Sequence, residues 1–330
     1  MNKKVHLSLI FALIIVLVLS ACGGDDDKKE ETRRFDEVTV QLKWLHNPQF
    51  AGFYAADRLG YYTQERIRIN LVPGGPNVDV ITPVENGTAM FGIAGGDFVL
   101  RDIAQGNKPF KVIGATYQIN PFVYVYLLGD EKEPLETADD WRGLRIAPFD
   151  DNVILAGILS TLGLTLDDVE VVTDAEFALG QFINGEMDVR GVFRTNEVLA
   201  LEAEGYQIQV IKPEDYGVLT YPDLIYMNTD KVNDDLAKRF MKATLRGWEY
   251  VTQNPDKVLD LVLEYAPSSD KDITQRTWEA SLPLFDASNG LLRLDENVMQ
   301  SMVNLMVQTG MLTEAPDLDK LYTTEYLDQG

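Results

Sequence analysis

The chain has 330 residues, of which 52 are acidic and 29 are basic, so its formal net charge is −23 at pH 7. This excess of negative charge argues against nucleic acid as a partner, because binding it depends on neutralising phosphates. It also argues against long-range steering of a strongly anionic ligand, although a local pair of arginines would still hold one. The single cysteine excludes a disulfide, a thiolate zinc site and a redox pair within the chain.

The first residues predict the cellular location. Lys3 and Lys4 precede an apolar run, Leu7–Leu19, which is too short for a permanent membrane helix and is typical of a signal-peptide core. The run leads into Leu-Ser-Ala-Cys, which resembles the lipobox of bacterial lipoproteins, whose cysteine is lipidated after cleavage. We predict a signal peptide over residues 1–21 and a lipid anchor at Cys22, on the extracytoplasmic face of the bacterial cell membrane. The alternative is an ordinary signal peptide in which the cysteine is present by chance.

Charged residues dominate the next stretch, residues 22–37, and it has no apolar periodicity. We predict a disordered, solvated tether that holds the folded part about 20 Å from its anchor. Without the signal peptide the balance is 27 basic residues against 52 acidic ones, or −25. The remaining part, about 300 residues, is long enough for roughly two lobes with buried cores.

The first predicted strand ends in a tryptophan. Apolar and polar residues alternate over Val38–Trp44, which indicates a strand. On this alternation the side chain of Lys43 points away from Trp44, and we expect its replacement to matter little for binding.

A helix is predicted directly after this strand. Asn47 stands at the N-cap position, Pro48 is the first helical residue and Gly60 lies just past the end. In open α/β sheets small molecules bind at the carboxyl ends of the strands, where helix N-termini offer unpaired N–H groups. This strand-to-helix turn is therefore the first candidate wall of a binding site.

The alternation of strands and helices continues to residue 128. Further strands are predicted at residues 67–73, 90–95, 110–117 and 122–128. Helices are predicted at residues 78–85 and 98–105, with Asp97 at the N-cap of the second.

A polar and acidic stretch after residue 128 indicates the start of a second lobe. Strands ending at residues 149, 173 and 193 alternate with helices at residues 153–162, at 175–183 and from about residue 197. Short strands alternating with helices imply parallel pairing and right-handed crossovers, which place these strand-to-helix turns on one edge of the sheet.

The last strands are predicted at residues 206–213 and 223–229, and helices follow at residues 232–253, 256–265, 273–283 and 296–308. Strands first and helices last would be odd for one doubly wound domain. They fit a chain that leaves a first lobe near Phe122, builds a second lobe and returns near Tyr221 to finish the first. We predict an α/β protein with lobe 1 at residues 38–124 and 222–330 and lobe 2 at residues 125–221.

The common catalytic patterns are missing from the sequence. His46 is the one histidine beyond the signal peptide, and no G-x-S-x-G elbow, HExxH, P-loop or GxGxxG pattern accompanies it. A histidine at a helix start is more often a hydrogen-bonded structural group. Paired acids such as Asp150 and Asp151 suggest solvated or capping groups in so acidic a chain. We predict that the protein is not an enzyme and that it holds no metal.

Aromatic side chains at strand ends are the stronger signal for a binding site. Two aromatic planes facing each other would hold a flat heterocycle between them. The alternative for Phe50 and Tyr54 is core packing, because with Phe53 they share one helix face. The aromatic candidates for ligand contact are Trp44, Phe50, Tyr54, Tyr117, Phe149 and Tyr216.

Polar side chains at the same strand ends would read the donors and acceptors of a heterocycle. The alternative for each is a helix cap, which requires the same residue types. The polar candidates are Asn47, Asn77, Asp97, Asn152, Thr195, Asn196 and Glu197.

Together these features give the chain a resemblance to the substrate-binding lipoproteins of ABC importers. Among them it is similar to the branch related to thiamine-pyrimidine precursor synthesis proteins, which begins with a strand, a tryptophan, a turn and then F-x-G-x-Y-x-A-x-x-x-G-Y-Y/F. The matching residues are Trp44, Asn47, Phe50, Gly52, Tyr54, Ala56, Gly60, Tyr61 and Tyr62. The similarity continues through GGDF at residues 95–98 and RTNE at residues 194–197.

The resemblance implies a type II periplasmic-binding-protein fold, with two α/β lobes joined by two crossover segments, that closes over a vitamin or vitamin precursor. It implies an ABC permease and its ATPase subunits as partners, no cofactor other than the transported ligand, a monomeric state and contact with the membrane only through the lipid anchor.

Within the branch, bacterial lipoproteins bind riboflavin or a formylaminopyrimidine, and the fungal members are pyrimidine synthases. The cysteine-rich iron-binding segment of the fungal enzymes is absent here, since Cys22 is the only cysteine. The opening QLKWLHNPQFAGFYAA is closer to riboflavin-binding members than to pyrimidine binders, which more often carry a W-x-P-N turn. We therefore expect riboflavin as the ligand, with a thiamine pyrimidine precursor as the alternative.

Overall fold

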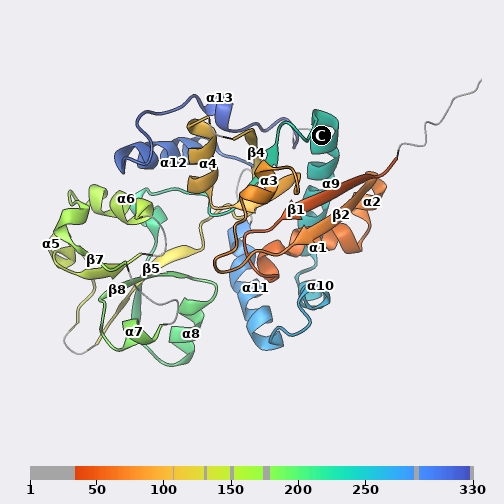
Figure 1. The fold of residues 1–330 in the computed structure, drawn as a ribbon. Helices are drawn as coiled ribbons and strands as arrows, with labels where there is room; N and C mark the ends of the chain where they lie inside the picture. The colour runs from red at the N-terminus through yellow and green to blue at the C-terminus, as the bar shows by residue number, and fades with distance from the viewer. Residues whose placement is uncertain are drawn as a thin grey trace, which may run out of the picture. The chain divides into compact units, whose positions relative to one another are not determined.

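The computed structural model describes residues 34–106, 108–129, 132–148, 152–173, 179–285 and 290–327 (Figure 1). The residues from Phe35 onward form one compact unit. The predictions for the signal peptide, for Cys22, for most of the tether and for Phe149 fall outside the described residues.

The first of two sheets has the strand order β2-β1-β3-β10-β4. Its strands are β1 (Asp36–Gln41), β2 (Ile67–Val72), β3 (Phe91–Ala94), β4 (Phe110–Ala115) and β10 (Leu224–Asn228). Strand β1 pairs in parallel with β2 and β3, whereas β10 lies antiparallel between β3 and β4. The strand predicted at residues 223–229 therefore completes the first sheet from its interior rather than at an edge.

The predicted turn after β1 is confirmed. The side-chain oxygen of Asn47 accepts a hydrogen bond from the N–H of Gln49, and Pro48 begins a short 3-10 helix, η1 (Pro48–Phe50), which continues into α1 (Ala51–Arg58). Three further helices follow α1 before the chain leaves the first sheet. They are α2 (Tyr61–Gln64), α3 (Thr82–Glu85) and α4 (Gly96–Ala104).

Helices follow the last strand, as the sequence predicts. They are α9 (Asp234–Gln253), η4 (Pro255–Lys257), α10 (Val258–Tyr265), α11 (Lys271–Phe285), α12 (Glu296–Gln308) and the short α13 (Leu318–Leu321). The first of them, α9, packs along α1, and the two helices share one buried core with β1 and β2. A segment from the end of the chain therefore covers the strands from its beginning.

Two glycines allow α1 and α9 to approach this closely. A Cβ on Gly247 would lie 2.0 Å from the carbonyl oxygen of Gly52, and a Cβ on Gly52 would lie 2.4 Å from the Trp248 ring. Neither neighbour can move without shifting a helix, so this contact requires glycine on both sides.

We expect Gly247→Ala to lower the free energy of unfolding by about 2 kcal/mol or more, because overpacking a core outweighs the gain in helix propensity. Urea unfolding followed by circular dichroism measures this change. The matched control is Gly180→Ala, where the added Cβ meets nothing within 4 Å. Equal stability of Gly247→Ala and wild type would show that the two helices separate without cost.

The second sheet has the order β7-β6-β8-β5-β9. Its strands are β5 (Phe122–Leu127), β6 (Arg145–Ala147), β7 (Glu170–Val171), β8 (Val189–Phe193) and β9 (Ile208–Ile211). Its helices are α5 (Ala138–Trp141), α6 (Val153–Thr161), η2 (Leu166–Asp168), α7 (Gly180–Ile183), α8 (Glu197–Ala203) and η3 (Pro213–Tyr216). The predicted parallel pairing holds for β6 with β7 and β8, while β5 is antiparallel to β8 and β9.

The chain passes between the two sheets twice, from β4 to β5 and from β9 to β10. The two passing segments are hydrogen-bonded to each other, since the side-chain amide of Asn120 donates to the hydroxyl of Thr220 at 2.7 Å. Each sheet has buried cores of its own. The lobe boundaries given above stay a prediction.

Candidate functional site

The larger of two adjoining cavities has a volume of 580 Å³. The first sheet contributes residues 78–81, before α3, and residues 94–98, where β3 runs into α4. The second sheet contributes Phe122, Phe193 and the first residues of α6. Both passing segments also line the cavity, through Asn120 and through residues 220–222. The cavity therefore lies where the two sheets and both passing segments meet.

The smaller cavity has a volume of 140 Å³ and a more polar lining. It shares Lys43 and Phe193 with the larger cavity, so the two adjoin at these side chains. Its remaining lining residues are Trp44, Gln49, Tyr117, Thr195, Asn196 and Glu197. Five of these six were predicted as ligand contacts from the sequence, and Gln49 was not. The turn after β1 and the turn after β8 thus come together at one small cavity.

Lys43 was expected to point away from Trp44 and to matter little for binding. This premise is wrong, because Lys43 lines both cavities and shares the smaller one with Trp44. Strand β1 ends at Gln41, so the alternation of side chains does not extend to Lys43 and Trp44. The ammonium of Lys43 lies 2.6 Å from the carboxylate of Asp223, which is fully buried, and donates to the carbonyl oxygen of Pro222 at 2.8 Å.

Asp223 is held by two further donors. The hydroxyl of Thr116 donates to its second carboxylate oxygen at 3.3 Å, and the side-chain amide of Gln49 donates to the same oxygen. A buried charge is costly unless it is paired and hydrogen-bonded, and here both conditions are met. An ammonium has three donors, and two of those of Lys43 go to Asp223 and Pro222.

Glu197 begins α8 and reaches back over the end of β8. One of its carboxylate oxygens accepts a hydrogen bond from the N–H of Phe193 at 2.9 Å. Burial raises the pKa of Glu197, while the N–H of Phe193 and the charge of the buried Arg190 act in the opposite direction. The folded protein therefore holds a proton on Glu197 more tightly than the unfolded chain does.

This raised pKa predicts a pH dependence of stability. At pH values between the ordinary pKa of a glutamate and the raised pKa of Glu197, the folded state binds more protons than the unfolded chain. The free energy of unfolding therefore falls as the pH rises through this range. We expect Glu197→Gln to flatten this fall, measured by urea unfolding from pH 4.5 to 7.5. The control, Glu202→Gln, removes an exposed acid from the same helix and should keep the wild-type slope. The same slope in all three proteins would contradict the assignment to Glu197.

Asp97 lies in the first turn of α4, where the helix meets the larger cavity. The expectation that Asp97 is the N-cap is wrong, because the N-cap is Gly95 and the helix begins one residue earlier than Asp97. A carboxylate oxygen of Asp97 lies only 3.0 Å from the position of a Cβ on Gly95. The carboxylate therefore folds back over the N-terminus of its own helix.

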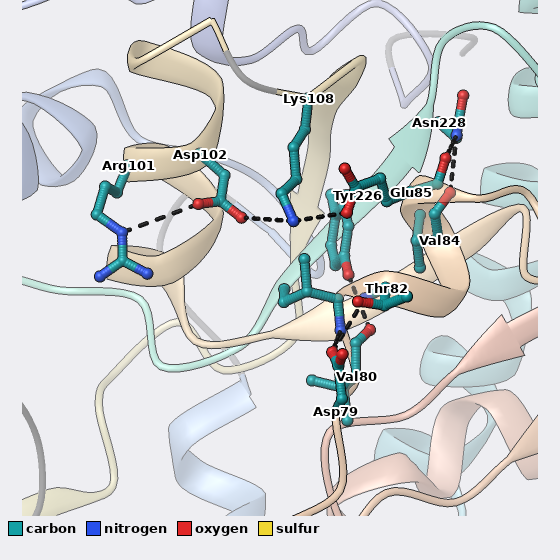
Figure 2. A network of polar contacts seen from close by, with 11 residues as sticks. Asp79, Val80, Thr82, Val84, Glu85, Arg101, Asp102, Lys108, Tyr226 and Asn228 are labelled. Carbon is teal, nitrogen blue, oxygen red and sulfur yellow. Dashed lines mark hydrogen bonds and ion pairs between the residues drawn. The ribbon is translucent and has the colours of Figure 1, made fainter.

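The cavity wall at residues 78–81 is held in place by a polar network (Figure 2). Asp79 accepts hydrogen bonds from the N–H groups of Ile81 and Thr82 at 3.0 Å, and the hydroxyl of Tyr226 on β10 donates to the carbonyl oxygen of Val80 at 3.2 Å. Hydrogen bonds from Thr82 lower the pKa of Asp79.

The far end of the same segment is anchored as well. The side-chain amide of Asn228 donates to the carbonyl oxygens of Val84 and Glu85, at 2.7 and 3.0 Å (Figure 2). Lys108 lies 2.7 Å from the carboxylate of Glu85 and 3.6 Å from that of Asp102 on α4. This wall is thus fixed to β10 at both ends and to α4.

Three predicted contacts near α1 line neither cavity. Phe50 and Tyr54 are fully buried in the core, as their shared helix face indicates. Tyr54 stacks on Tyr265, and its hydroxyl lies 3.0 Å from Nδ1 of His46, so this histidine has the hydrogen-bonded structural place expected of it. Both polar atoms of the Asn47 side chain are used within the turn, with Gln49 and Leu45.

Three further predicted contacts also lie outside the cavities. Asn77 is exposed, with a positive φ of 60°. Asn152 precedes α6 with a φ of 66°, and its side chain caps no N–H of the helix among the described residues. Tyr216 packs edge-on against Trp141 in the core of the second sheet.

Sequence reasoning missed several aromatic residues of the larger cavity. They are Phe98, Phe122, Phe193 and Tyr221. The sequence places Phe122 and Tyr221 at the two passages of the chain between the lobes. An aromatic residue at such a passage is itself an indication of ligand contact. Phe98 is 39% exposed, and an exposed aromatic in the first turn of a helix next to a strand end is a second such signal.

A family model described as NMT1/THI5 like matches residues 47–258, which is more than half of the chain. The chain belongs to the NMT1/THI5-like family. The resemblance inferred from the opening motif is thereby confirmed. The matched range begins at Asn47, within the turn after β1, and includes all of the second sheet and strand β10. It therefore contains lining residues from both sheets, while Lys43 and Trp44 precede it.

Proteins with assigned roles are similar to this chain over most of its length. The riboflavin-binding protein RibY of Chloroflexus aurantiacus is 26% identical over 315 residues, covering 89% of this chain and 87% of that protein. The formylaminopyrimidine-binding protein of Halalkalibacterium halodurans is 25% identical over 260 residues, 76% of each chain. A 4-amino-5-hydroxymethyl-2-methylpyrimidine phosphate synthase of Legionella pneumophila is 24% identical over 306 residues, covering 88% of this chain and 92% of that protein.

Solved structures confirm the predicted fold class. The periplasmic aliphatic sulphonate-binding protein SsuA from Escherichia coli matches with a TM-score of 0.67 at 13% identity, over 86% of this chain and 91% of that chain. The chain therefore has the periplasmic-binding-protein fold, with its two mixed sheets as two α/β lobes. Several of the similar proteins are named as binding proteins, among them RibY, the formylaminopyrimidine-binding protein and SsuA. Others are named as enzymes, among them the pyrimidine phosphate synthases and the desulfurization enzyme DSZB.

Neither a membrane-spanning helix nor a metal-binding cluster is present among the described residues. None of their helices has both the length and the apolar character needed to span a membrane. In the same part of the chain, no three or more histidine, cysteine, aspartate and glutamate side chains are grouped so that they could hold a metal ion.

Proposed function

We propose that this protein is the lipid-anchored substrate-binding component of an ABC importer, and that it captures riboflavin in the two adjoining cavities and delivers it to a permease. The observation that carries the proposal is the larger cavity, with four aromatic residues and a volume of 580 Å³ at the meeting of both sheets. Pockets for drug-sized ligands have volumes of about 300–1,000 Å³ and mostly apolar linings with a few polar groups.

Riboflavin fits both cavities in chemistry. Its tricyclic ring is flat and largely apolar, and the aromatic side chains of Phe122 and Phe193 line the larger cavity from the second sheet. One end of the ring carries carbonyl oxygens and an N–H group. The smaller cavity beside it offers Asn196 and Glu197 as acceptors and Lys43 as a donor. The ribityl chain would then extend toward the cavity rim at residues 78–79 and 97–98, where residues 78, 79 and 98 are exposed.

From the sequence-predicted contacts we retain six as proposed ligand contacts because they line a cavity. They are Trp44, Asp97, Tyr117, Thr195, Asn196 and Glu197. To these we add Lys43 and Phe193, which border both cavities. Phe149 stays a prediction.

A thiamine pyrimidine precursor is the second candidate. The smaller cavity favours it, because 140 Å³ beside Trp44, with the carboxylate of Glu197, suits a single ring that carries an amino group. A single ring would leave most of the larger cavity without ligand, and for this reason we place riboflavin first.

The deciding experiment is to purify the protein, denature it and record the absorbance and fluorescence spectra of the small molecule released. Near-equimolar oxidised flavin that matches a riboflavin standard supports the proposal. If no flavin is released, the protein is titrated with riboflavin and with aminopyrimidines. Binding of the pyrimidines alone would overturn riboflavin as the ligand and leave a role in uptake.

The lipid anchor and the importer partners rest on the sequence and on the family. Metabolic labelling with palmitate tests the anchor, since label should enter the wild type and not Cys22→Ser. Uptake of labelled riboflavin into cells with and without this protein tests delivery. Equal uptake in the two strains would contradict the transport role.

A further inference from the structure

The charges around the two cavities indicate which form of a ligand the site accepts, an inference that rests on the proposed function. Among the described residues that line the cavities, Lys43 is the only basic one, whereas Asp79, Asp97 and Glu197 are acidic. The charge of Lys43 is matched by the fully buried Asp223 at 2.6 Å. The lining therefore offers no unmatched positive charge to a ligand.

The N-terminus of α4 would otherwise suit an anion. Helix N-termini carry unpaired N–H groups and a partial positive charge, and phosphates commonly bind there. The helix has nine residues, its N-cap glycine has no side chain, and Gly95 and Gly96 both line the larger cavity. Glycine at such a position lets a ligand approach the backbone closely.

The carboxylate of Asp97 reduces the attraction of this helix terminus for an anion. Its carboxylate oxygen lies 3.0 Å from the Cβ position of Gly95, over the first turn of α4 and on the cavity side. A negatively charged side chain of the protein itself thus lies at the helix terminus that a phosphate would approach. Asp79 adds a second carboxylate on the facing segment at the exposed rim.

We propose that the site accepts heterocycles without a phosphate group and rejects their phosphate esters, and that Asp97 is the main determinant of this selectivity. A phosphate at the end of the ribityl chain would lie beside Asp97 and Asp79, where like charges repel. Desolvation of the phosphate would add to the cost, since no unmatched cation of the lining replaces its water.

The test compares two ligand pairs, riboflavin with riboflavin 5′-phosphate and hydroxymethylpyrimidine with its phosphate, by calorimetric titration of the full protein at low and high salt. In whichever ligand pair shows binding, we expect the phosphate-free ligand to bind at least 100-fold more tightly than its phosphate ester. We expect Asp97→Asn to reduce that preference at least tenfold, through tighter binding of the phosphate ester.

Glu202→Gln is the matched control, because it removes one exposed negative charge on α8 that lines neither cavity. It should leave the preference unchanged. Equal affinity for both members of a pair, or the same preference in Asp97→Asn and wild type, would overturn the inference and leave the proposed function standing. Failure of all four ligands to bind would overturn both. If the preference for the phosphate-free ligand falls equally in Glu202→Gln and Asp97→Asn, it depends on the net charge of the protein, and the role of Asp97 is overturned.

Discussion

Replacing Lys43 with methionine is expected to lower the free energy of unfolding by about 3 kcal/mol, because it leaves the carboxylate of Asp223 buried and without its counter-ion. Asp223 is fully buried, while the Lys43 side chain is 22% exposed. Water therefore reaches the ammonium and tempers the effect, so we place it at the lower end of the range for broken buried pairs. Urea unfolding of the ligand-free protein at pH 7 measures it.

The double variant Lys43→Met with Asp223→Asn separates charge from packing. It removes the unpaired charge and keeps an acceptor for Thr116 and Gln49, so most of the lost stability should return. If Lys43→Met costs less than about 0.5 kcal/mol, the hydrogen bonds from Gln49 and Thr116 suffice for Asp223. If the double variant is as unstable as the single one, the loss comes from packing of the lysine stem.

Replacing Trp44 with alanine is expected to weaken riboflavin binding at least tenfold, which corresponds to about 1.4 kcal/mol. Trp44 lines the smaller cavity and is partly buried against the core of the first sheet. An aromatic pair contributes about 0.5–1.5 kcal/mol beyond its buried area, so loss of a stacked ring and of that area together reach the expected change. Quenching of flavin fluorescence measures the dissociation constant.

The matched control for Trp44 is the next residue in the same turn. Leu45 is 54% exposed and lines neither cavity, so Leu45→Ala should bind riboflavin with wild-type affinity. Unchanged affinity of Trp44→Ala would remove this side chain from the site. A loss shared by both variants would show that the turn itself had moved.

Local features of the fold could be predicted from the sequence because the signals were local. The Asn47 cap, the helix after Pro48 and the parallel pairing around β6 follow from turn chemistry and alternation, and the structure confirms them. The place of β10 between β3 and β4 could not be predicted in this way. It depends on a long-range pairing that no local pattern encodes.

The site could be predicted only in part, for a related reason. Thr195, Asn196 and Glu197 were found because they follow a strand, and strand ends gather at the edge where ligands bind. Lys43 was misjudged because alternation was extended past the end of β1. Tyr216 has the residue type of a binding group, but the core of the second sheet uses the same type. Asn152 precedes α6 as predicted, yet its side chain neither caps the helix nor lines a cavity.

The position of β10 also has a consequence for how the chain folds during synthesis. Strands β3 and β4 are made early, but the strand that joins them, β10, follows only after the whole second sheet has been made. Until then the facing edges of β3 and β4 are unpaired, and unpaired strand edges invite association with other chains. The first sheet therefore closes late, through contacts of long sequence separation that slow folding. A chain that ends before Leu224 lacks this closing strand, so its first sheet stays in two parts.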